Sequence, residues 1–100
     1  MVKIEAIVRK EKFDDVCKVL ERSGIGGMTV TPVQGFGHHR NGLQEKIKLE
    51  IYADEFQVDA IVGMIRGAAQ TATTGDGKIA ILNLENIYRI RTGEEGAAAI

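Results

Sequence analysis

The segment Thr74–Lys78 is the part of the sequence best suited to bind a phosphate group. Its two glycines let the backbone approach a ligand closely and turn amide N–H groups toward it, and its lysine adds a mobile positive charge. The segment is not a Walker A loop, because no glycine stands at the required upstream spacing and Ile79 replaces the Ser or Thr after the lysine. A plain connector between a helix and a strand is the alternative interpretation.

Two arginines, Arg89 and Arg91, stand two residues apart near the C-terminus. Residues at this spacing on an extended strand point to the same face. Two guanidinium groups on one face can make forked contacts to a phosphate group. The alternative is that both side chains are solvated at a strand edge.

The segment Gly35–Gly37 opens a loop in which the backbone can again lie close to a ligand, and two histidines, His38 and His39, follow it. Adjacent histidines on an extended chain diverge, and no cluster of Cys, His or carboxylate residues has the spacing of a metal site. Cys17 falls on the apolar stripe of a predicted helix, and nothing resembles a general base with an orienting partner. The sequence therefore predicts no metal ligands and no catalytic residues.

Composition limits the class of partner. The 100 residues carry 13 Lys and Arg against 14 Asp and Glu, so the formal charge is −1. This balance argues against nucleic acid or an anionic membrane surface as the main partner. A single cysteine excludes an internal disulfide, and no signal peptide or membrane-spanning run is apparent, so a cytoplasmic location is expected.

The elements that would position these residues follow from hydrophobic periodicity and turn residues. Alternating or β-branched patterns predict strands, helical spacing predicts helices, and Asp54 with Gln57 predicts a helix start. The predicted strands are Val2–Arg9, Met28–Phe36, Glu45–Ala53 and a final extended region Ile79–Arg91, followed by a tail Gly93–Ile100. The predicted helices cover residues 13–20 and 54–69, and the predicted loops are Gly37–Gln44 and Thr71–Lys78.

The order of these elements is βαββαβ, which predicts one α+β domain over residues 1–100. Right-handed crossovers place both helices on one face of a four-stranded antiparallel sheet, the ferredoxin-like arrangement. The other sheet face stays open, and a small sheet with apolar residues on both faces gains by oligomerising. This fold carries many functions, so the function must be argued from the site.

Several segments occur together in an order that resembles the nitrogen-regulatory PII signal-transduction family. They are Lys3–Ile7, Gly26–Val30, Gly35–Gly37, Gly75–Ile79 and Arg89–Gly96, and the closing Ala99 and Ile100 fit as well. The resemblance covers nearly the whole chain, and its C-terminal segment is highly specific. It implies a homotrimer of ferredoxin-like subunits that binds ATP or ADP in the three clefts between neighbours.

The resemblance also implies a role for individual residues. Thr29 and the backbone around Tyr52 would hold the adenosine end of the nucleotide, and Glu50 would lie near the base. Gly37 and His38 would lie beside the phosphates. The residues that would wrap the phosphates are Gly75, Asp76, Gly77 and Lys78, and those that would reach in from the adjacent subunit are Arg89 and Arg91.

The sequence departs from the family in the loop between the second and third predicted strands, which has shrunk to His38–Glu45. The tyrosine that many relatives have uridylylated is absent. His39 replaces the glutamine that helps to hold magnesium and 2-oxoglutarate, although Lys46 matches the lysine that pairs with the 2-oxoglutarate carboxylate. These departures predict a weak 2-oxoglutarate site and an altered or lost contact with the target protein.

Three hypotheses follow. The first is a trimeric adenine-nucleotide sensor acting on an unknown target protein, for which a membrane transporter is a candidate. The second is a PII-like sensor of bicarbonate and adenylates, in which His38, His39 and Arg40 form a small-anion pocket. The third is a structural trimer that binds no small molecule. An enzyme such as a slow ATPase lacks support, because the sequence offers no general base with an orienting partner.

Overall fold

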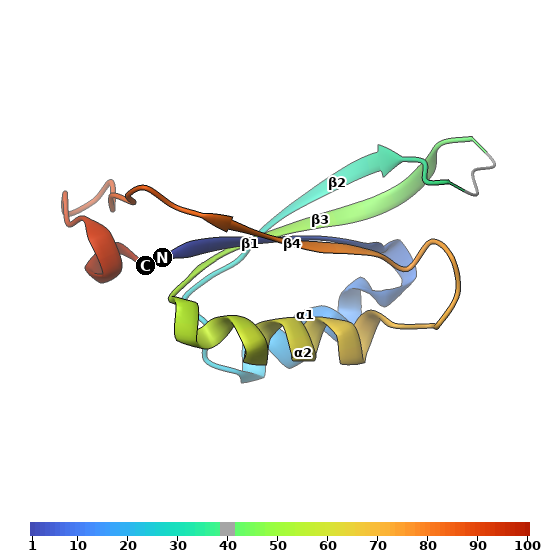
Figure 1. The fold of residues 1–100 in the computed structure, drawn as a ribbon, viewed down its shortest axis with the longest axis horizontal. Helices are drawn as coiled ribbons and strands as arrows, with labels where there is room; N and C mark the ends of the chain where they lie inside the picture. The colour runs from blue at the N-terminus through green and yellow to red at the C-terminus, as the bar shows by residue number, and fades with distance from the viewer. Residues whose placement is uncertain (39–41) are drawn as a thin grey trace.

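The computed structural model describes residues 1–38 and 42–100, which contain four strands and two α-helices in the order β1-α1-β2-β3-α2-β4 (Figure 1). The strands are Val2–Arg9 (β1), Thr29–Gly35 (β2), Gln44–Ala53 (β3) and Gly77–Asn83 (β4). The helices are Phe13–Arg22 (α1) and Val58–Ala69 (α2), each preceded by a short 3₁₀ turn. The predicted βαββαβ order is confirmed.

The strands form one antiparallel sheet in the order β2-β3-β1-β4, and both helices cover the same face of it (Figure 1). Strand β1 is central: Ile4 lies opposite Ile51 of β3 on one side and Ile81 of β4 on the other. This topology confirms the ferredoxin-like fold. Among the described residues, no helix is long and apolar enough to cross a membrane.

The core lies between the sheet and the helices. The even-numbered residues of β1 are at most 2% exposed, because successive side chains of a strand alternate between its two faces. They pack against one buried stripe from each helix. The fully buried residues of largest volume are Ile4, Val8, Val16, Leu20, Leu49, Ile51, Ile61 and Ile65.

Asp54 and Gln57 begin the helical segment that contains α2, as the sequence predicts, although its first turn, Glu55–Gln57, is a 3₁₀ turn. The backbone N–H of Asp54 donates to Gln57 Oε1 at 3.0 Å, and Asp54 and Gln57 form a reciprocal capping box. Such a box satisfies amide groups that have no partner inside the helix. It fixes the start of the 3₁₀ turn Glu55–Gln57, which continues directly into α2.

The face of the sheet away from the helices is uncovered in the single chain and carries an alternating set of charges. Glu5 of β1 lies directly opposite Glu50 of β3. Lys3 bridges them, with its Nζ atom 3.6 Å from Glu5 and 3.2 Å from Glu50, and Lys48 lies 3.9 Å from Glu50. These cations offset the repulsion that two directly opposed carboxylates would otherwise create.

The last strand ends earlier than predicted. Strand β4 stops at Asn83 instead of continuing to Arg91, and it begins at Gly77, inside the predicted loop. The last backbone contact along this ladder is from Leu84 N to Met1 O at 3.0 Å. Without a partner strand the chain turns back on itself, and an isolated bridge joins Tyr88 to Glu95. The same-face argument for the two arginines was therefore wrong.

Two hairpins extend the molecule along its longest axis. The chain measures 45 × 24 × 20 Å, with the β2–β3 hairpin at one end and residues 84–100 at the other (Figure 1). We name residues 87–96 the C-terminal hairpin. Residue Ile90 at its tip is fully exposed, and Tyr88 is 61% exposed. Apolar side chains that bury so little surface within their own chain favour contact with another molecule.

We expect Leu49→Ala to lower the free energy of unfolding by about 2–5 kcal/mol, because Leu49 is fully buried between the sheet and the helices. The matched control is Leu43→Ala, since Leu43 is 62% exposed and its truncation should cost less than about 0.5 kcal/mol. Chemical denaturation at one chain concentration measures both. Equal losses in the two variants would contradict this assignment of the core.

Candidate functional site

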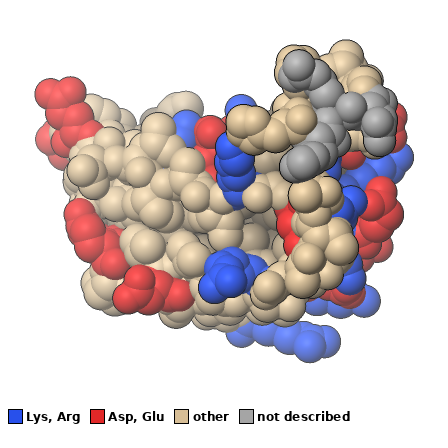
Figure 2. All heavy atoms as spheres, turned by 45° about the vertical axis from the view of Figure 1, so that its right-hand side comes forward, with Lys and Arg blue, Asp and Glu red and all other residues tan. Residues whose placement is uncertain are grey.

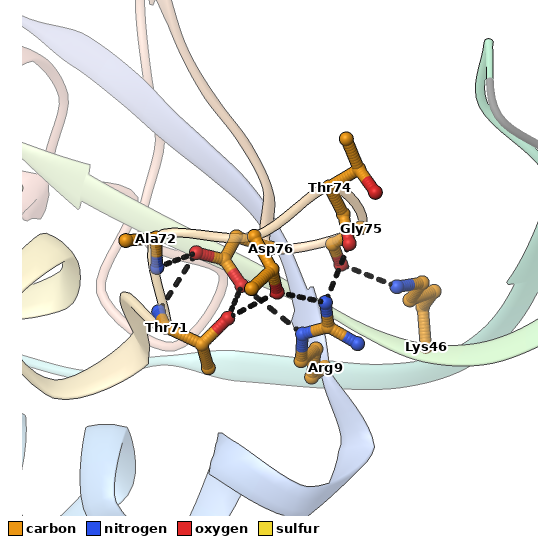
Figure 3. Close-up of polar contacts among 8 residues, drawn as sticks. Arg9, Lys46, Thr71, Ala72, Thr74, Gly75 and Asp76 are labelled. Carbon is orange, nitrogen blue, oxygen red and sulfur yellow. Dashed lines mark hydrogen bonds and ion pairs between the residues drawn. The ribbon is translucent and has the colours of Figure 1, made fainter.

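The turn between α2 and β4, residues 71–76, is organised by one carboxylate (Figure 3). Asp76 Oδ2 accepts hydrogen bonds from the backbone N–H of Thr71 at 2.7 Å and of Ala72 at 3.0 Å. Asp76 Oδ1 accepts from the Thr71 hydroxyl and from Arg9 Nε, the latter at 3.1 Å. The Asp76 side chain thus links the end of the turn to its start at Thr71 and Ala72, and links the turn to Arg9 at the end of β1.

These donors also fix the charge of Asp76. The hydrogen bond from the Thr71 side chain, followed by the one from its backbone, lowers the pKa of Asp76 far below its usual range. Arg9 and the backbone N–H of Ala72 lower the pKa further. The carboxylate is therefore ionised throughout the physiological pH range, and it serves the turn as an acceptor.

Two cations from the sheet bind carbonyl groups of the same turn (Figure 3). Arg9 Nη2 donates to Thr73 Oγ1 at 3.0 Å and to Thr74 O at 2.6 Å, and Lys46 Nζ donates to Gly75 O at 2.6 Å. Arg9 and Lys46 are direct cross-strand neighbours on β1 and β3. Sequence reasoning selected Lys46 but missed Arg9, although pairing of the predicted strands would have brought the two together.

Gly77 is required by a close backbone approach. Its φ angle is +105°, and a Cβ atom at this position would lie 1.7 Å from the carbonyl oxygen of Ile7. Gly75 also has a positive φ, +95°, which only glycine adopts readily. The approach lets β4 pair with β1 at once, and it sets Lys78 opposite Ile7 on the uncovered face of the sheet.

The turn offers groups of the kind that bind anions. In residues 1–38 and 42–100, no group accepts a hydrogen bond from the backbone N–H of Gly75. Backbone N–H groups in a turn of this kind suit an anion, and Lys78 adds a positive charge nearby. A cleft of about 400 Å³ adjoins the turn between β4 and α2, and Arg66 and Lys78 are among its lining residues. Around this end of the molecule, basic and acidic side chains are interleaved (Figure 2).

The residues predicted at the adenosine end form a second group. Thr29 lies directly opposite Glu50, and Tyr52 follows two residues later on the same, uncovered face, where it is 46% exposed. The Glu50 carboxylate is held by Lys3 at 3.2 Å. Strand β1 separates this group from β4, so about 10 Å lies between Glu50 and the strand that carries Lys78.

The two arginines form a third group at the far end of the molecule (Figure 1). Strand β4 lies between them and the turn, which corresponds to about 20 Å. Arg89 Nη1 pairs with Glu94 at 2.9 Å, and Arg89 Nη2 donates to Ala98 O at 3.0 Å. Arg91 is exposed at the turn of the C-terminal hairpin. One chain thus does not bring Arg89 and Arg91 to the Gly75–Lys78 segment.

The remaining predicted residues lie around the loop that follows β2. Gly37 and His38 are exposed directly after that strand, and His39 lies outside the described residues. Within the described part of the chain, no group of three or more His, Cys, Asp or Glu side chains could hold a metal ion. Burial, followed by its hydrogen bond to Glu21, raises the pKa of the Cys17 thiol, which disfavours the reactive thiolate.

Comparison with known proteins identifies the family to which this chain belongs. The family model described as "Nitrogen regulatory protein P-II" matches residues 1–94. The chain is 42% identical to the nitrogen regulatory protein P-II of Nostoc punctiforme and 43% identical to that of Pasteurella multocida. It is also 42% identical to the nitrogen regulatory protein P-II 1 of Escherichia coli. Each comparison covers the full length of both chains.

The chain therefore belongs to the P-II family of nitrogen regulatory, signal-transducing proteins. The comparisons run over 112 positions, against the 100 residues of this chain. The aligned relatives thus contain residues that have no counterpart here.

We expect Asp76→Asn to destabilise the chain at neutral pH, since an amide replaces an acceptor of four hydrogen bonds. The folded pKa lies below the unfolded value of about 4, so the carboxylate stabilises the fold above that pH. This contribution is lost as the pH falls toward the folded pKa. The difference in free energy of unfolding between wild type and variant, measured by denaturation at several pH values, should therefore shrink below about pH 4.

The control for this measurement is Glu85→Gln, which neutralises an exposed carboxylate outside the turn. Its free energy of unfolding should follow that of the wild type at every pH. A difference between wild type and Asp76→Asn that does not change between pH 7 and pH 3 would show that the carboxylate charge does not hold the turn.

Proposed function

We propose that the chain is an adenine-nucleotide-binding regulatory protein of the P-II type that works as a homotrimer. The observation that carries the proposal is the turn before β4, which holds a free Gly75 amide and leads into Lys78 beside a cleft that Asp76, Gly77 and Lys78 help to line. Such an arrangement suits the polyphosphate of ATP or ADP. The proposed role is regulatory binding, because no described residue combines a general base with an orienting partner at this site.

The separation of the three groups supports a site shared between chains. The Gly75–Lys78 segment, the Glu50 group and the arginine pair lie at three different places on one chain. A nucleotide that contacts all three must lie where neighbouring copies meet. The phosphates would bind the turn of one copy, and the C-terminal hairpin of a neighbour would supply Arg91.

The shape of the chain supports trimerisation as well. One face of the sheet has no covering layer in the described residues, and the C-terminal hairpin exposes Tyr88 and Ile90. Closed cyclic symmetry lets each copy use the same two surfaces, with the face of one copy meeting the hairpin of the next. Three copies would produce three equivalent nucleotide sites.

The chemistry of the second group suits an adenosine. Glu50 presents a carboxylate that can accept a hydrogen bond from the amino group of adenine. Tyr52 exposes an aromatic ring on which a base can lie, and the Thr29 hydroxyl can both donate and accept. These features support adenine nucleotides as the ligands, and Glu50 would contribute to specificity for the base.

The connection between β2 and β3 is proposed as the shortened surface that meets a target protein. It comprises only residues 36–43, and the comparisons with longer relatives support the loss of residues from this chain. Phe36 and Leu43, at its two ends, are 60% and 62% exposed. Nucleotide binding would act by stabilising one arrangement of this loop, and a membrane transporter is one class of target for it.

A small anion is a second candidate ligand, and the position of Lys46 favours it. The Lys46 ammonium lies at the Gly75 carbonyl, next to the Arg9 guanidinium, so two cations from adjacent strands meet at the base of the loop. A carboxylate or bicarbonate bound there would touch the same turn as the nucleotide. Calorimetric titration of ADP with and without bicarbonate or 2-oxoglutarate tests this, and an unchanged ADP affinity would exclude such coupling.

We expect Lys78→Ala to weaken ATP binding by about 10- to 150-fold, because a charge-assisted contact contributes about 1.5–3 kcal/mol. Isothermal titration calorimetry measures the affinity. Lys18→Ala is the matched control, since Lys18 is exposed on α1, and it should bind ATP like the wild type. A wild type that binds no adenine nucleotide would overturn the proposed function, and an unchanged Lys78→Ala affinity would remove Lys78 from the site.

We expect sedimentation equilibrium of the wild type to give the mass of three chains. Ile90→Asp should shift the equilibrium toward single chains, because it places a charge on the exposed apolar tip of the C-terminal hairpin. Leu43→Asp, a similar change at an exposed leucine in the connection between β2 and β3, should leave the mass unchanged. A wild type that sediments as a single chain at high concentration would exclude the shared site.

A further inference from the structure

The outward face of α2 differs from that of α1. Every exposed residue of α1 is charged, as expected for a helix surface in water. These residues are Asp14, Asp15, Lys18, Glu21 and Arg22. The exposed residues of α2 instead include Ala60, Gly63 and Gly67, and the turn that precedes α2 leaves Phe56 84% exposed. An exposed aromatic ring beside a helix surface of small residues favours contact with another molecule.

The chain itself gives no reason for the two glycines of α2. Neither Gly63 nor Gly67 has a positive φ, and a Cβ atom at either position would meet no atom of the described residues within 4 Å. Glycine is unfavourable inside a helix, because it loses more backbone freedom on folding than any other residue. A helix surface without side chains does, however, let the axis of a second helix approach closely.

Two opposite charges lie on the same face of α2. Asp59 and Arg66 are seven residues apart, which corresponds to two turns and about 10 Å along the helix, so they share a face but cannot pair with each other. Both are exposed, and neither side chain forms a hydrogen bond or an ion pair with any residue in 1–38 and 42–100. Gly63 lies between them on this face.

This arrangement is complementary to itself. If two copies of α2 meet in antiparallel orientation about a two-fold axis beside Gly63, Asp59 of each copy faces Arg66 of the other. A two-fold contact uses the same surface on both copies, so each charge pair occurs twice. The small residues at the centre allow the close approach that brings both pairs together.

We propose that the outward face of α2 binds the same face of a second copy of this chain, antiparallel and related by a two-fold axis. Two Asp59–Arg66 pairs flank a close approach at Gly63, and Phe56 of each copy covers the end of the other helix. Helix α2 lies in the helical layer, away from the uncovered face of the sheet that the proposed trimer would use (Figure 1). The contact therefore joins chains of two different trimers.

The size of the contact determines how it must be measured. One helix against one helix buries less surface than a standard interface, which takes about 1,200–2,000 Å² in total. The association is therefore weak, and dilute protein keeps the mass of three chains. A covalent trap detects a weak contact, because two thiols held together by it react far more often than thiols that meet by random collision.

Disulfide trapping tests the proposal. Gly63→Cys is introduced together with Cys17→Ser, so that the chain carries a single thiol. A denaturing gel without reductant measures the rate at which mild oxidation joins two chains. This rate should exceed by about tenfold that of Lys18→Cys in the same background, because Lys18 lies on the charged face of α1, where only random collisions join thiols.

Charge reversal tests the orientation of the two helices. Asp59→Arg, added to the Gly63→Cys chain, sets two guanidinium groups against each other in both pairs and should slow the cross-linking by about tenfold. Arg66→Asp should slow it by a similar factor. The chain with both reversals should cross-link as fast as Gly63→Cys alone, because opposite charges again face each other. Lys18→Glu, a reversal on α1, should leave the rate unchanged.

The outcomes are distinct from those that test the proposed function. Restoration by the double reversal supports the α2 contact and shows that the single variants are folded. Equal rates for cysteines at positions 63 and 18 would overturn the proposal, and so would a double reversal that stays slow. A wild type that binds no adenine nucleotide would remove the proposed function and leave the α2 contact standing.

Discussion

The carboxylate of Asp76 accepts hydrogen bonds from two backbone amides, one hydroxyl and one guanidinium, and these contacts determine the path of the chain between α2 and β4. Because the carboxylate is occupied on all sides, Asp76 shapes the turn more than it can touch a ligand. Its acceptor role fixes the turn in which the Gly75 amide stays without a partner among the described residues. The proposed binding of an anion at this turn thus depends on a carboxylate whose charge the protein already compensates.

Local sequence patterns were sufficient to predict the strands of the sheet and the helices. Alternation in Val2–Arg9 and the Asp54 capping box each depend on residues a few positions apart, and the structure has both features. The end of β4 could not be predicted in this way, because a strand needs a partner as well as suitable residues. Strand propensity continues past Asn83, but there the chain turns back and pairs Tyr88 with Glu95 instead.

For the candidate site, too, the sequence predicted features set by neighbouring residues but not contacts between residues far apart in the chain. The glycines and the lysine of the turn were recognisable from composition, and the Gly77 approach to Ile7 explains why glycine is needed there. Arg9 was missed, because its partners lie more than sixty positions away in the sequence. The internal pairing of Arg89 was missed for a different reason. Two arginines at strand spacing suggested a shared face, and only the folded hairpin reveals that one of them is already bound.

The charges on the uncovered sheet face have a consequence for assembly. The charges of Lys3 and Lys48 balance those of Glu5 and Glu50, so in the proposed trimer another copy would cover the set as a neutral group. Reversal of one charge in the set would leave an uncompensated ion in a low-dielectric environment, which is strongly unfavourable. A related chain with a different charge arrangement at these positions would be a poor substitute for a subunit. The face would thus limit the formation of mixed oligomers in a cell that makes several such chains.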